Sequence, residues 1–127
     1  MSARTKRLRQ LIELQQQMKA IREMRHADLR REAAAAEQEA AALMAGVENQ
    51  SPIASLFGDL YTKRIGAALT RKDEKNRLAR EEATRIASET ARANIVRRYY
   101  QEALRQEERM EAEKETLESV TRQTLER

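Results

Sequence analysis

Cysteine and tryptophan are missing from this 127-residue sequence, and glycine, proline and aromatic residues are scarce. Without cysteine the chain can form neither a disulfide scaffold nor a thiolate metal site, and its composition fits a reducing compartment. One Phe and three Tyr are the only large rings, too few to fill a globular core of ordinary thickness. The sequence therefore favours narrow burial of one helix against another.

Helix formers and charges take the place of the missing residues. Charged side chains make up 36% of the chain, and Glu, Arg and Lys are, like the abundant Ala, Gln and Leu, strong helix formers. No apolar stretch approaches the roughly 20 residues needed to cross a bilayer. We therefore expect a helical, cytoplasmic protein without membrane insertion.

Two long stretches lack helix breakers almost completely. Gly46 is the only Gly or Pro within residues 4–48, and residues 71–127 contain neither. We therefore predict an all-α fold, an antiparallel two-helix coiled-coil hairpin that forms one domain over residues 1–127. Its first arm is expected over residues 4–48, a short helical tip over 49–70 and the second arm over 71–127.

The expected tip carries helix-start signals and many large apolar residues. Ser51 followed by Pro52 is a good N-cap and first-turn pair, and predicts a short helix that runs to about Leu69. Thr70 with Asp73 has the spacing of a capping box, which predicts the start of the second arm. The large side chains form a docking surface unless the tip helix folds back and buries them. They are Ile53, Leu56, Phe57, Leu60, Tyr61, Ile65 and Leu69.

Small and apolar residues recur along both arms at alternating intervals of three and four, the pattern of a coiled-coil seam. A shift near Arg25 predicts a stutter that locally unwinds the supercoil. Eight of the thirteen residues 33–45 are Ala, which predicts a thin seam and closely approaching backbones. The expected seam residues are Leu14, Met18, Ile21, Leu29, Ala33, Ala36, Ala40, Leu43 and Val47 in the first arm, and Ala79, Ile86, Ala93, Val96, Tyr100, Ala103, Met110 and Leu117 in the second.

Charge is distributed in four blocks. Residues 1–31 have nine basic and three acidic side chains, residues 32–60 none and five, residues 61–98 eleven and five, and residues 99–127 five and eight. A tight turn at Asn49 would set two basic blocks side by side, whereas a fold centre near residue 60 pairs each basic block with an acidic one. Complementary charge favours the second arrangement through the sum of many weak pairs.

No residue pattern indicates catalysis, a metal or a cofactor. The glycines do not form a phosphate loop, and the single His26 has no cysteine or second histidine to share a metal or a triad. Carboxylate pairs such as Glu81 and Glu82 lack the accompanying Glu-x-x-His motifs of di-metal bundles, so we expect them on solvated faces. Basic runs near Arg4 and Arg71 have no interleaved aromatic residue for base stacking, which makes nucleic-acid binding the less favoured reading.

The helical pattern, the leading Arg4, Leu8, Leu11 and Leu14, and the tip with Phe57 and Tyr61 give the chain a recognisable architecture. It resembles the stalk proteins of type III secretion, the flagellar FliJ and injectisome YscO group, which are similar in shape to the central γ stalk of rotary ATPases. The resemblance rests on architecture and size over the whole chain. It implies a non-enzymatic protein whose paired termini enter the ring of a hexameric export ATPase and whose tip contacts the export gate.

Carried over by position, the resemblance implies two sets of partner-binding residues. Gate contacts would fall on Phe57, Leu60 and Tyr61. Ring contacts would fall on Arg4, Arg7, Leu11 and Met18 and, opposite them, on Arg109, Met110 and Leu117. Two other functions stay open: a general coiled-coil adaptor in which two hairpins pair, and a basic coiled coil that binds nucleic acid.

Overall fold

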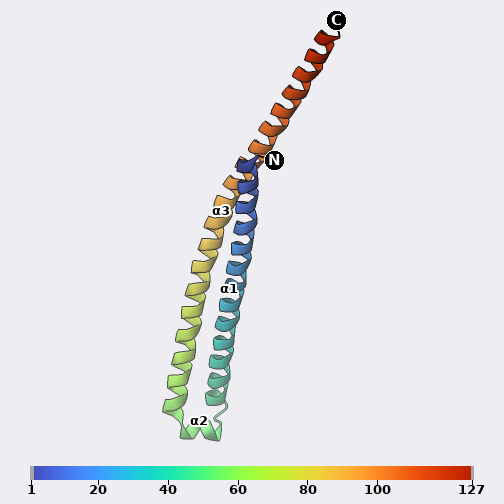
Figure 1. Ribbon diagram of the computed structural model, residues 1–127. Coiled ribbons are helices and arrows are strands. Elements are labelled where there is room, and N and C mark those ends of the chain that lie inside the picture. The colour runs from blue at the N-terminus through green and yellow to red at the C-terminus, as the bar shows by residue number, and fades with distance from the viewer. Residues whose placement is uncertain (1, 127) are drawn as a thin grey trace. The chain divides into compact units, whose positions relative to one another are not determined.

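A computed structural model describes residues 2–126 as three helices (Figure 1). They are α1 (Ala3–Glu48), α2 (Pro52–Leu56) and α3 (Gly58–Leu125). The two long helices pack against each other, and the described residues contain no strand. The prediction of an all-α fold is therefore confirmed.

Contacts divide the chain into two compact units. The turn unit consists of residues 19–87, and so contains the end of α1, all of α2 and the start of α3. The terminal unit consists of residues 2–18 together with residues 88–126. Each unit has its own rows of residues that face the neighbouring helix.

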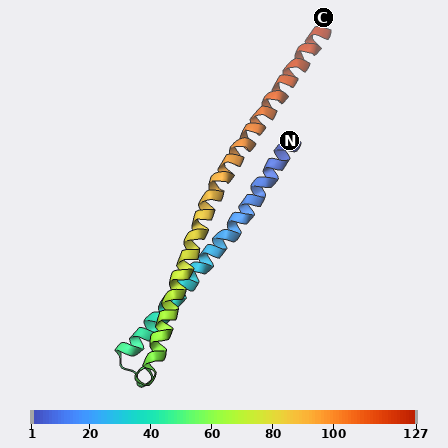
Figure 2. The same ribbon diagram turned by 90° about the vertical axis from the view of Figure 1, so that its left-hand side faces the viewer.

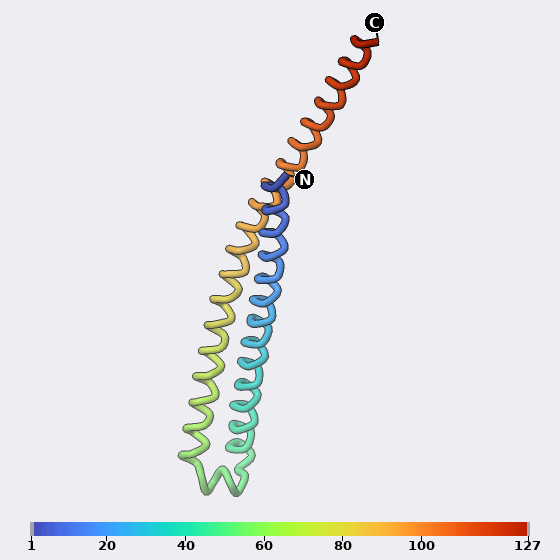
Figure 3. The backbone as a smooth tube through the Cα atoms, in the orientation of Figure 1, coloured from blue at the N-terminus to red at the C-terminus, as the bar shows by residue number. Residues whose placement is uncertain are grey.

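The connection between α1 and α3 is short and capped (Figure 3). After α1 ends, Gln50 adopts a left-handed conformation with φ 51°, and the Ser51 amide donates a 3.1 Å hydrogen bond to the Gly46 carbonyl. The Ser51 hydroxyl then accepts a 3.1 Å hydrogen bond from the Ala54 amide, and Pro52 occupies the first turn of α2. The expected N-cap at Ser51 is thus confirmed.

Helix α3 begins at Gly58, earlier than the sequence indicated. The short helix expected to run to Leu69 ends at Leu56, and the capping box expected at Thr70 and Asp73 lies within α3. A capping sequence starts a helix only where the preceding chain leaves the helical conformation. The chain before Thr70 stays helical, because its seam residues already pack against α1.

The core of the turn unit consists almost entirely of alanine. Only one buried apolar residue, Leu29, is larger. The thin seam predicted from the Ala-rich run is therefore present, and dispersion between closely packed small side chains replaces the large-residue layers of an ordinary core. The buried alanines of this unit are Ala33, Ala36, Ala40, Ala54, Ala68 and Ala79.

From Thr5 to Leu43, one row of less exposed residues of α1 keeps an unbroken spacing of three and four, so the predicted stutter near Arg25 is absent. Leu14, Met18 and Ile21, expected in the seam, are exposed. The seven-residue frame of the alanine run simply continues toward the N-terminus, and polar residues with long aliphatic stems occupy its positions. In order they are Thr5, Leu8, Ile12, Gln15, Lys19, Arg22, His26, Leu29, Ala33, Ala36, Ala40 and Leu43.

The two helices of the turn unit run in opposite directions (Figure 1, Figure 2). Ion pairs that join them follow the same order. As the acidic partner moves back along α1, the basic partner moves forward along α3. The N–O distances are 2.9 Å for Glu39–Arg71, 3.3 Å for Glu37–Lys72 and 2.9 Å for Glu32–Lys75. The acidic second block therefore meets the basic third block, as the charge argument predicted.

In the terminal unit the start of α1 is tied to α3 at Glu107. The carboxylate Oε1 accepts hydrogen bonds from the Thr5 hydroxyl at 2.6 Å and from the Ser2 amide at 2.8 Å. Beyond this point residues 108–126 are all exposed. Across residues 2–126, no helix contains an apolar stretch of the length and purity that a bilayer crossing requires.

Candidate interaction surfaces

Large apolar side chains lie outside the alanine core, and one group of them surrounds α2. We call Ile53, Leu56, Phe57 and Leu60 the turn cluster; all four are exposed, Phe57 at 53% and Leu60 at 52%. Helix α2 has five residues and buries only Ala54, so it cannot cover these side chains itself. Two of the three residues expected to contact a gate, Phe57 and Leu60, are therefore accessible to a partner.

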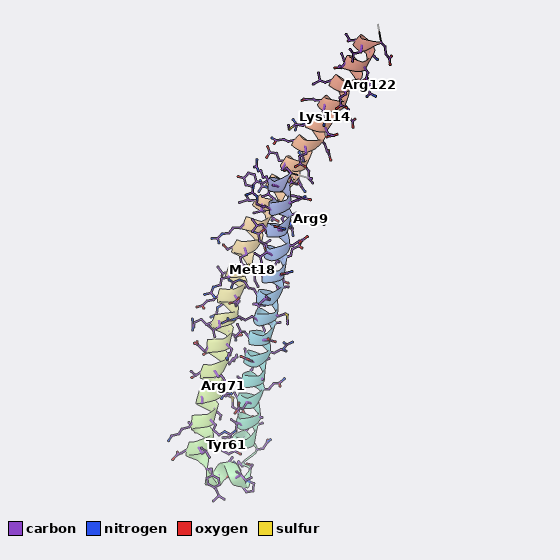
Figure 4. All side chains as sticks on the ribbon, in the orientation of Figure 1. Arg9, Met18, Tyr61, Arg71, Lys114 and Arg122 are labelled. Carbon is purple, nitrogen blue, oxygen red and sulfur yellow. The ribbon has the colours of Figure 1, made fainter. Side chains whose placement is uncertain are left out.

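Tyr61, the third expected gate residue, lies differently. Its side chain is half-buried, and a Cβ added to Gly46 would lie 3.4 Å from the Tyr61 Cε1 atom. Figure 4 labels Tyr61 where α3 faces the end of α1. The ring therefore packs against the α1 backbone where a glycine leaves room, and it stabilises the turn unit more than it offers a surface.

A second surface lies in the terminal unit. The expected ring residues Arg4, Arg7, Leu11 and Met18 each immediately precede a seam residue of α1, and so they share one side of the helix. Leu14, which has the same offset and is 51% exposed, belongs with them. The expectation that Leu14 lies in the seam is therefore wrong. Two neighbouring rows of apolar residues on α1 have the same spacing, and only the partner helix distinguishes them.

Helix α3 borders the same surface. Leu11, Leu14, Gln15 and Met18 line a groove of about 220 Å³ with Glu89 and Arg92 of α3. The groove is apolar along α1 and charged along α3, and it is open to solvent. This arrangement suits contact with another helix and contains no enclosed pocket for a small substrate.

The remaining expected ring residues, Arg109, Met110 and Leu117, do not lie opposite the first turns of α1. Thr5 is already paired with Glu107, so these residues belong to the part of α3 that continues beyond α1 in the same unit. We call residues 108–126 the tail. Met110 and Leu117 are 69% and 67% exposed, and Figure 4 shows Lys114 and Arg122 projecting from this single helix.

Glu82 is the one large side chain that the helices of the turn unit bury completely among the described residues, at 2% exposure. It forms ion pairs with Arg25 at 3.5 Å, Arg22 at 3.5 Å and Arg85 at 3.1 Å. The expectation that Glu82 lies on a solvated face is therefore wrong, whereas its neighbour Glu81 is exposed and bonded to Arg77. The spacing in the sequence could have indicated this burial, because Glu82 follows the seam residue Ala79 by three positions.

Many charged side chains of the described residues form ion pairs with one another. No three His, Asp or Glu side chains between residues 2 and 126 come together as metal ligands would. The Arg71 guanidinium, through a hydrogen bond and its charge, lowers the pKa of Glu39, and Arg64 adds to the effect. These interactions hold helices together and keep carboxylates charged.

Compared with models of protein families, with curated proteins and with solved structures, the chain matches none. The function must therefore be argued from the surfaces themselves. They are the turn cluster, the groove side of the terminal unit and the tail.

Proposed function

We propose that this chain is a non-enzymatic coiled-coil hairpin that acts as a stalk or adaptor in a bacterial type III export apparatus, flagellar or injectisome. The single observation that carries the proposal is the turn cluster, because four exposed apolar side chains around a short connecting helix form a compact docking surface. The antiparallel ion pairs of the turn unit support the hairpin.

Helix length supports a stalk. With 46 residues α1 extends about 70 Å, and with 68 residues α3 extends about 100 Å. Helices of this length do not need a globular core to present a binding surface, because each can pack along its neighbour. In the proposed function the turn cluster contacts the export gate, and Arg4, Arg7, Leu11 and Met18 contact the ring of the hexameric export ATPase.

The first experiment measures binding to the two proposed partners. The purified chain is expected to co-purify with the hexameric export ATPase and to stimulate ATP hydrolysis. Phe57→Ala with Leu60→Ala is expected to abolish capture of the cytoplasmic part of the export gate. Thr62→Ala, an exposed change in the same stretch of α3, is the matched control and is expected to retain capture.

Loss of capture in both variants, or no binding to either partner by the unaltered chain, contradicts the stalk proposal. A homodimerising adaptor is the second candidate, and the exposed apolar residues of the terminal unit favour it, because a monomer leaves them in water. Light scattering at low micromolar concentration tests it. A salt-dependent shift of duplex DNA tests the less favoured nucleic-acid reading.

A further inference from the structure

The terminal unit has two surfaces without a partner in the chain: the groove side of its helix pair and the tail. We propose that the groove side binds the tail of a second copy of this chain, and that the second copy binds the first tail in the same way. The proposal concerns a surface other than the turn cluster, and it does not depend on the stalk function. It gives the side of α1 with Leu11 and Met18 to a second copy, so in the stalk function the tail and the ATPase ring would compete for this side.

The groove side includes residues of both helices. An antiparallel helix pair has a local two-fold axis that exchanges the two helices and keeps the same face of the pair toward the viewer. Residues that immediately precede a seam residue in either helix therefore lie on the same face of the pair. On α1 these residues include Leu11, Leu14 and Met18. On α3 the matching offset selects Arg92, Ile95 and Tyr99, and the presence of Arg92 in the groove agrees with this assignment. Ile95 and Tyr99 are exposed, so with Leu11, Leu14 and Met18 they form an apolar strip on the groove side, which Arg92 borders.

The tail has the pattern of a helix that lacks its partner. Met110, Leu117 and Val120 are exposed apolar residues at intervals of seven and three, and lie on one side of α3. The tail spans residues 108–126, about 28 Å of helix, while the first helical residues of the terminal unit, 3–18, span about 24 Å. A tail therefore has the length needed to cover the strip once.

Charge favours this pairing. The paired part of the terminal unit has four basic and one acidic side chain in residues 2–18, and four basic and three acidic in residues 88–107, for a net charge of +4. The tail has three basic and six acidic side chains, for a net charge of −3. Opposite charge on two apolar surfaces promotes their association and opposes tail-to-tail contact.

The occupant must come from another molecule. Helix α3 runs without interruption from Gly58 to Leu125, so its tail continues away from the helix pair and cannot fold back onto its own groove side. In a two-fold symmetric dimer, the tail and the groove side of both copies are covered, because each tail packs as a third helix beside the helix pair of the other copy. Such a contact is isologous and closed, so it predicts a dimer and no larger assembly.

Sedimentation velocity of the full chain over a concentration series tests the proposal. A dimer is expected, and its dissociation constant is expected to rise between about 0.1 M and about 1 M salt, where the screening length falls from about 10 Å to about 3 Å. Leu14→Glu in the strip and Leu117→Glu in the tail are each expected to weaken association at least about tenfold, since each sets a charge against an apolar partner.

Two matched controls add the same charge on the other side of each helix. Gln16→Glu and Ser119→Glu lie roughly opposite the strip and the tail stripe, and are expected to dimerise like the unaltered chain. Circular dichroism of all four variants verifies that they remain helical.

Mixing supplies the decisive measurement. Leu14→Glu retains an intact tail and Leu117→Glu an intact strip, so an equal mixture restores one of the two contacts and is expected to associate more tightly than either variant alone. A monomeric unaltered chain overturns the proposal. Normal dimerisation of Leu14→Glu, which would indicate contact between tails, or no gain on mixing also overturns it.

Discussion

The Thr5 hydroxyl donates a 2.6 Å hydrogen bond to the Glu107 carboxylate, across 102 residues of sequence. The Ser2 amide donates to the same oxygen at 2.8 Å, and the Thr5 side chain is fully buried. The contact fixes which turn of α3 lies beside the start of α1. Hydrogen bonds from Ser2, and then from Thr5, lower the pKa of Glu107 to about 2.

This contact predicts an acid-sensitive terminal unit. The pKa of Glu107 is lower in the folded chain than its ordinary value of 4.5, so its stabilising effect is complete above pH 4.5 and disappears as the pH falls toward 2. We expect Glu107→Gln to lose less stability than the unaltered chain over that interval. Thermal melts followed by circular dichroism between pH 7 and pH 2 measure the difference, and parallel pH profiles of the two proteins would contradict it.

Glu82 offers a second prediction, with its neighbour as the control. Glu82→Ala removes the buried carboxylate that Arg22, Arg25 and Arg85 share, and is expected to lower the free energy of unfolding by about 1–2 kcal/mol. Glu81→Ala removes an exposed pair with Arg77 and is expected to change it by less than about 0.5 kcal/mol. Urea unfolding compares the two, and equal effects would show that the burial of Glu82 is unimportant.

Two glycines within the long helices are expected to limit stability. Apart from the adjoining residues and backbone of its own helix, no atom lies within 4 Å of a Cβ added to Gly66. Gly66→Ala is therefore expected to raise the free energy of unfolding by about 0.5–1 kcal/mol through helix propensity alone. Gly46→Ala gains the same preference but brings a methyl group to 3.4 Å from Tyr61. We therefore expect a smaller gain in stability for Gly46→Ala, measured as the shift in the urea midpoint. Destabilisation by Gly66→Ala would contradict the predicted effect of helix propensity.

Phe57 and Tyr61 are expected to respond differently to truncation. Phe57→Ala removes an exposed ring of the turn cluster, and is expected to change stability by less than about 0.5 kcal/mol. Tyr61→Ala removes a half-buried ring that packs against Gly46, and is expected to cost about 2 kcal/mol. Thermal melts of the two single variants test this, and a large loss from Phe57→Ala would indicate that the turn cluster is core.

The sequence was sufficient to predict the long helices and the alanine core, because helix breakers and small residues at heptad spacing are local signals. It misled at Leu14, Met18 and Ile21, which have a heptad spacing of their own. The structure gives the seam to Gln15, Lys19 and Arg22. These positions continue the frame of the alanine run, and Arg22 pairs there with Glu82 of the other helix. This contact between residues distant in sequence cannot be read from the apolar spacing of α1.

The turn and the candidate surfaces were predicted less completely for a related reason. Thr70 and Asp73 have the residues of a capping box, but α3 is already helical there because its preceding turns pack on α1. Phe57 and Tyr61 were both expected at the tip, but Tyr61 packs against Gly46 whereas Phe57 is exposed. The tail was expected to be part of the second arm, whereas its lack of an α1 partner follows from the pairing of Thr5 with Glu107.

Alanine at the contact has a mechanical consequence for the turn unit. Ala36, Ala40 and Ala68 are buried at the contact, and side chains this small allow helix axes to approach toward the short end of the usual 8–10 Å range. A helix pair of this kind has a smaller cross-section than one joined by leucines, so it can enter a narrower opening. One bulky replacement, such as Ala40→Leu, would act as a wedge and widen the pair at that level.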